Sequence, residues 1–170
     1  MDMASQGGKQ LAQLTREKVA AMNRLCKGVE EATASKAPEG RWTPKEIICH
    51  LIGPEGIGTL AGFQLILQQD TPLIEIVPAD SFFTGKRQQM SFSALLAEFN
   101  SEYAKVADLV ETLSDEQLAR KAHIPLFKEL PMGEYPSLLM FGQALVEYHL
   151  SDHINHMTDI LKGLGVSVSA

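Results

Sequence analysis

Three of the five histidines in the chain lie in one short segment, YHLSDHINH, as His149, His153 and His156. On an α-helix, spacings of four and then three residues place these side chains on one face, within about 60° of arc. Neutral imidazoles four residues apart on a helix can both bind one divalent metal ion. The segment therefore predicts half of a metal site, with His149 and His153 as ligands and a further ligand from elsewhere in the chain.

His50, in EIICHLI, is the candidate for the missing ligand because it lies on an apolar helical surface. It lies about 10 Å from the start of its predicted helix and His153 about 15 Å from the end of the last one, so the two can meet if these helices run antiparallel. The residue types leave a second interpretation open, in which His50 is a core histidine bonded to a backbone carbonyl.

His156 lies one turn beyond His153 and has three candidate roles. It can be a fourth ligand, a group that hydrogen-bonds a ligand, or a proton acceptor that faces the substrate. We rank the second and third roles first and take His156 as the candidate catalytic residue. Asp152 is expected to be a surface carboxylate, Glu55 is the nearest candidate carboxylate in sequence to His50, and His123 is assigned no role.

Other chemistries have little support in the sequence. It contains no GxGxxG, P-loop or GxSxG motif. The two cysteines, Cys26 and Cys49, are too few for a disulfide framework and are expected to be reduced core residues. A dyad of Cys49 with the adjacent His50 is not expected, because neighbouring residues on a helix point about 100° apart.

Four long helical patterns must position the histidines: about 6–34, 43–69, one that opens near 91 with apolar positions as far as Val110, and 137–164. Thr43, with Pro44 and Glu46 after it, predicts a capping box at the start of the second helix. Ser114 and Gln117 predict a short further helix in the same way. Gly53 and Pro54 predict a kink beside His50.

The fourth helix is expected to place the histidines on its interior face. Steps of three and four residues give one stripe: Leu138, Gly142, Leu145, His149, His153, His156, Ile160 and Leu164. The opposite side carries Glu147, Ser151, Thr158 and Lys162. The helix is expected to stop at Gly163 or Gly165.

The fold is predicted to be an all-α four-helix bundle in a single domain, 1–170. PLIEIV is the only strand candidate, and it is short. Two connectors, near 70–90 and 113–137, are each long enough to cross the bundle from one end to the other. The topology is therefore not expected to be simple up-down-up-down.

Composition excludes some partners. The net charge of −6 and the lack of a basic run argue against nucleic acid. The N-terminal segment has no basic start followed by an apolar run, so we expect no signal peptide and a cytoplasmic protein. The apolar span 47–67 contains His50, Pro54, Glu55 and Gln64, which favours a buried bundle helix over a membrane span.

Two segments resemble a known family. RWTPKEIICHLI is similar to the start of the second helix in the DinB-like superfamily of metalloenzymes, and YHLSDHINHMTDILKGLG to its last helix with HxxxH. The resemblance implies a metal triad of His50, His149 and His153, an up-down-down-up bundle with two long crossover connections, and a homodimer. Several relatives carry glutamine in place of His156, and Gly53-Pro54 also departs from the family pattern.

Relatives in this family include S-transferases that use bacillithiol or mycothiol and a maleylpyruvate isomerase. The resemblance thus favours a thiol-dependent S-transferase with a divalent metal, zinc or nickel, a low-molecular-weight thiol as cosubstrate and a small-molecule substrate. A metal-dependent hydrolase is the second reaction class. A different class also stays open, a binding or stress-response module in which the metal is structural.

Overall fold

The helix that carries His50 begins where the sequence predicts. The computed structural model describes residues 4–168, and in it Thr43 caps α3 (Pro44–Ile52). The Thr43 hydroxyl accepts a hydrogen bond from the Glu46 N–H, and the Glu46 carboxylate accepts one from the Thr43 N–H. This confirms the capping box and fixes the position of His50 two turns into the helix.

Three other helices also start where the sequence predicts. Ser91 caps α5 (Phe92–Thr112), and Ser137 caps α7 (Leu138–Gln143). Ser114 opens α6 (Asp115–Leu118) with the predicted capping box.

The first helix is shorter than predicted. It ends as α1 (Gln6–Cys26), and a separate single turn, α2 (Glu31–Ala34), follows. Between them Gly28 has a φ of 78°. Lys27 leaves the helix with an extended backbone, and Gly28 completes a turn in which the Val29 N–H donates to the Cys26 carbonyl.

The prediction of one kinked helix over 43–69 is wrong, because the chain forms two helices there. α3 stops at Gly53, whose φ of 90° turns the chain away before Pro54, and α4 (Leu60–Gln68) follows. The Gly53 N–H bonds the carbonyls of Cys49 and His50. His50 therefore lies in the last turn of α3, and the proline never has to fit inside a helix.

The last helix is continuous but contains an unpredicted π-helical segment. α7 leads into η3 (Ala144–His149), which is π-helical, and then into α8 (Leu150–Gly163). The predicted stop at Gly163 is confirmed. The π segment ends at His149, the first histidine of the group.

The π segment changes which face of the last helix is buried. Buried residues upstream are spaced by four, as Leu138, Gly142, Val146 and Leu150. On a uniform α-helix, the side-chain direction would rotate by about 120° over the twelve steps from Leu138 to Leu150. A π-helix has more residues per turn, so the side-chain direction changes less from one residue to the next. All four of these residues therefore face the core.

In α8, which follows η3 in the chain, the buried residues are Leu150, Met157, Ile160 and Leu161. The predicted interior face is therefore wrong by one residue over much of this helix: Val146, Leu150 and Met157 are buried where Leu145, His149 and His156 were expected. His149, His153 and His156 flank the core and are half-buried, and Ser151 and Thr158, predicted on the outer side, are half-buried too.

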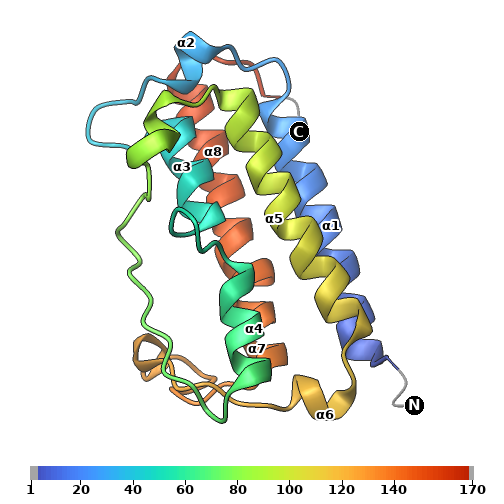
Figure 1. Cartoon of the computed structure of the whole chain (residues 1–170). Coiled ribbons are helices and arrows are strands. Elements are labelled where there is room, and N and C mark those ends of the chain that lie inside the picture. The colour runs from blue at the N-terminus through green and yellow to red at the C-terminus, as the bar shows by residue number, and fades with distance from the viewer. Residues whose placement is uncertain (1–3, 169–170) are drawn as a thin grey trace.

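The helices form one bundle in which a long connector runs along the outside (Figure 1). Figure 1 shows α3, α4 and α5 running one way, and α1 and the α7–α8 helix the other. The connector from α4 to α5, with the short helix η1 (Gly85–Gln89), crosses from one end of the bundle to the other.

The second connector does not cross the bundle, contrary to the prediction of two crossovers. It stays at the end where α5 finishes and α7 begins (Figure 1). The Leu138 N–H donates to the Arg120 carbonyl and the Ala122 N–H to the Pro136 carbonyl, so the segment with η2 (Pro125–Phe127) folds back on itself. PLIEIV gives only an isolated bridge between Leu73 and His123, and the described residues contain no strand.

Two hydrophobic clusters form the core. One joins α1, α3, α5 and α8, and includes Ile47, Leu51, Leu150 and Met157. The other joins α1, α4, α5 and α7. Within residues 4–168, every helix is too short or too polar to cross a membrane.

Replacing Thr43 with alanine is expected to lower the free energy of unfolding by about 1 kcal/mol, because it removes the oxygen that caps the α3 N-terminus. Thr43→Ser keeps that oxygen and should stay near the wild type. Urea unfolding measures both. Equal losses in the two variants would contradict the capping role.

Cys26 and Cys49 are buried in the first cluster, and burial raises the pKa of each thiol to about 12. At mildly alkaline pH both are therefore protonated as well as inaccessible. We expect a disulfide reagent to label neither in the native protein and both in denaturant. Rapid labelling of either thiol in the native state would contradict this.

Candidate metal centre

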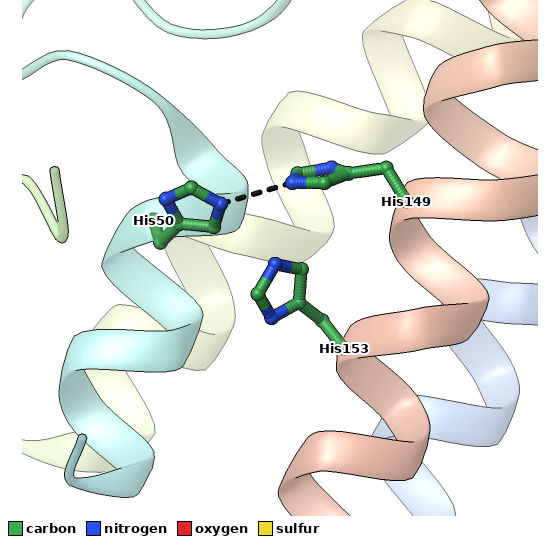
Figure 2. A group of neighbouring side chains, drawn as sticks. All are labelled: His50, His149 and His153. Atoms are coloured by element: carbon green, nitrogen blue, oxygen red, sulfur yellow. Dashed lines mark hydrogen bonds between the residues drawn. The ribbon is translucent and has the colours of Figure 1, made fainter. Parts of the chain in front are cut away.

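His50, His149 and His153 meet in the structure although His50 is far from the other two in sequence. Each offers one ring nitrogen, and the three nitrogens lie within 4.8 Å of one another. Nε2 of His50 is 2.9 Å from Nε2 of His149. Figure 2 shows one nitrogen of His153 facing the other two rings. The structure thus brings together the three residues that the sequence singled out.

The backbone fixes the position of each ring. The capping box sets the start of α3, and His50 follows in its last turn. His149 ends the π segment, and His153 lies one turn later in α8. The first hydrophobic cluster, shared by α3 and α8, holds these helices together beside the rings.

The tautomer of His50 is set by a backbone carbonyl. Nδ1 of His50 lies 2.7 Å from the Asp80 carbonyl oxygen, so Nδ1–H donates and Nε2 keeps its lone pair. Metal-binding histidines commonly have such a partner on the far nitrogen. His50 therefore fits both interpretations of the sequence at once, since it is bonded to a carbonyl and also faces the other histidines.

His156 lies behind His153, away from the point where the three nitrogens converge. Its Nδ1 is 3.4 Å from Nδ1 of His153. One of these two nitrogens must carry the proton that they share. With the proton on His153, the other nitrogen of that ring has a free lone pair.

Burial keeps these imidazoles neutral. Burial, together with the charge that neighbouring imidazoles would carry, lowers the pKa of His149 to about 4 and that of His153 to about 3. Burial also lowers the pKa of His50, and it lowers the pKa of His156 together with the nearby Arg41. Neutral rings have the lone pairs that metal binding needs.

Aromatic rings surround the histidines on two sides. The Trp42 ring lies 5.0 Å from His50 and is stacked, 7° from parallel, on His153 at 6.3 Å between ring centroids. Phe82 stacks on His50 at 6.3 Å and 8°. The sequence did not predict that Trp42 and Phe82 lie against the histidines. It also did not predict the role of Asp80, because this residue acts through its backbone carbonyl, which any residue type supplies.

Other polar residues considered in the sequence lie elsewhere. A Cβ on Gly85 would lie 2.6 Å from the Glu55 carboxylate, so Glu55 packs against η1. Asp152 is exposed, as expected. His123 pairs with Glu134 at 3.3 Å.

Three converging imidazoles can hold a divalent ion. Two nitrogens bound to one tetrahedral zinc are about 3.3 Å apart, close to the 2.9 Å between His50 and His149. His50 offers a lone pair at this point, and His149 and His153 are neutral. Nitrogen donors of this kind suit zinc, nickel, copper and iron.

The fold and the three-histidine group define a class of protein, the helical bundle with a candidate metal centre between two of its helices. The sequence profile of the DinB superfamily matches residues 13–157, and the chain belongs to this superfamily. The resemblance found in the two histidine segments is thereby confirmed.

A solved structure supports the fold. The chain is similar to YfiT from Bacillus subtilis, described as a probable metal-dependent hydrolase with an unusual four-helix bundle topology. The two share 23% identity and a TM-score of 0.73, over 94% of this chain and 89% of YfiT. A comparison with curated proteins gives no match.

His149→Ala and His153→Ala are each expected to abolish stoichiometric binding of zinc, because each removes one of three ligands. His123→Ala is the control, since His123 lies in the second connector and pairs with Glu134. Protein made without an affinity tag is loaded, dialysed and analysed for metal. Equal retention of zinc by the wild type and both ligand variants would contradict the assignment.

Proposed function

We propose that His50, His149 and His153 bind a divalent metal ion, zinc first and nickel second, and that the protein is a metal-dependent hydrolase of a small-molecule substrate. One observation carries the proposal. Three neutral imidazoles from two helices bring their nitrogens within 4.8 Å, with the Nε2 lone pair of His50 directed at this point.

A divalent ion held by three histidines supplies an open coordination position, where it polarises a carbonyl and lowers the pKa of water to about 7. The chain's own groups prepare this site. The Asp80 carbonyl keeps the proton of His50 on Nδ1. Burial keeps all three rings neutral at neutral pH, so a metal ion does not have to compete with an imidazolium charge.

His156 has a role that follows from its contact with His153. If His153 were to hold a metal ion through its Nε2, its Nδ1–H would donate to Nδ1 of His156. This leaves the Nε2–H of His156, on a half-exposed ring, to donate to the substrate. His156 thus orients a ligand and contacts the substrate, and glutamine, which has an acceptor and a donor, can take the same place.

Thiol-dependent S-transfer, with a low-molecular-weight thiol as cosubstrate, is the second candidate. The family resemblance of the histidine segments favours it, whereas the description of YfiT favours hydrolysis. Both reactions need the same open position on the ion. We place hydrolysis first because YfiT matches the chain over nearly its whole length.

A purely structural ion is the competing interpretation. The two hydrophobic clusters hold α3 to α8 and the other helices without any contribution from the histidines. The rings lie at the edge of this core and are half-buried, apart from His50, which is buried. This arrangement favours a catalytic ion over a structural one.

Removing the ion with a chelator is expected to abolish activity and leave the protein folded. The melting temperature should fall only by the amount that loss of a bound ligand explains, with helical circular dichroism unchanged. A panel of esters and amides is assayed beside transfer of a thiol to an electrophile, each with and without zinc or nickel. Unfolding on chelation would favour a structural ion. Metal-dependent thiol transfer without hydrolysis would reverse the order of the two reactions.

A further inference from the structure

Arg87 is the largest side chain that the described fold buries completely, with 1% of its surface exposed. Its Nη1 donates to the Gly53 carbonyl at 2.6 Å and to the Phe82 carbonyl at 3.3 Å. Its Nη2 donates to the Glu98 carboxylate at 2.8 Å. A buried guanidinium is costly unless several partners compensate for its lost hydration. These partners show which parts of the chain Arg87 joins.

Two of the partners of Arg87 belong to segments that carry or contact His50. Gly53 ends α3, the helix that carries His50, and Glu98 lies on α5. Phe82 belongs to the long connector, and its ring stacks on the His50 ring. One guanidinium therefore ties the end of α3 to the stretch of connector that touches His50.

That stretch is a tight turn with an unfavourable backbone. Phe82 has a φ of 53°, in a region that costs free energy for residues other than glycine. The turn is closed by the Phe82 N–H, which donates to the Asp80 side chain at 2.8 Å. Such a turn persists only where its surroundings hold it, and Arg87 binds the Phe82 carbonyl. The same turn presents the Asp80 carbonyl to Nδ1 of His50.

We propose that Arg87 is a positioning residue for His50, holding the Asp80–Phe82 turn against α3 so that the Asp80 carbonyl keeps the His50 proton on Nδ1. Without that acceptor the neutral ring returns to the tautomer that free imidazole side chains prefer, with the proton on Nε2. The proton would then block the nitrogen that faces His149 and His153. The effect on metal affinity rests on the proposed function, but the tautomer is a property of the metal-free protein.

Arg87→Lys tests this, because lysine keeps the charge but cannot reach three partners in a fixed fork. The matched control is Arg120→Lys. Arg120 also donates to two backbone carbonyls at a helix end, those of Ile66 and Gln69, at 2.8 and 2.7 Å. It belongs to the second connector, so the control changes the same chemistry away from the histidines.

The first readout is the ring-nitrogen NMR spectrum of the metal-free protein, with His50 assigned by its loss in His50→Gln. Nδ1–H is expected in the wild type and in Arg120→Lys, and Nε2–H or a mixture in Arg87→Lys. The second readout is zinc affinity by chelator competition, which should fall by about 10- to 100-fold in Arg87→Lys alone. An unchanged tautomer in folded Arg87→Lys would overturn the proposal, whether or not the wild type binds zinc.

Two further variants keep the test decisive if Arg87→Lys does not fold. Asp80→Ala removes the acceptor that closes the turn, and Asp80→Asn restores one at the same place. Asp80 is exposed, so neither change disturbs the core. We expect the His50 tautomer to change in Asp80→Ala and to be recovered in Asp80→Asn. The wild-type tautomer in both would overturn the role of the turn.

Discussion

The 2.9 Å contact between Nε2 of His50 and Nε2 of His149 is the geometric requirement of the candidate metal site. Two neutral imidazoles meet there at the edge of an apolar core, on helices from distant parts of the chain. Small shifts of either helix would separate the nitrogens. The elements around the contact limit such shifts: the capping box of α3, the core shared by α3 and α8, and the turn that bonds Nδ1 of His50.

Much of the site could be predicted from sequence because its signals are local or periodic. The HxxxH spacing identifies two candidate ligands, and the capping box at Thr43 places His50 on the helix that follows. An imidazole among leucine and isoleucine needs a polar partner, which is why His50 stands out in EIICHLI. These features follow from side-chain chemistry within a few residues of one another.

The rest could not be predicted, for identifiable physical reasons. The π segment has no residue signature, so the predicted interior positions of the last helix are wrong by one residue between Val146 and Met157. Gly53 turns the chain before Pro54, and two side chains distant in sequence stabilise this turn. Tyr103 donates to the Leu51 carbonyl, and Arg87 donates to the Gly53 carbonyl. The Asp80 contact uses a backbone oxygen, and the second connector is held at one end by backbone hydrogen bonds. None of these interactions depends on a local residue pattern.

X-ray absorption spectroscopy of the zinc-loaded wild type tests the three-histidine site most directly, because it reports the atoms bound to the ion. The structure predicts three imidazole nitrogens at about 2.0–2.1 Å, with the remaining position taken by a light atom. Fewer than two imidazoles, or a sulfur ligand at about 2.3 Å, would contradict a site made by His50, His149 and His153.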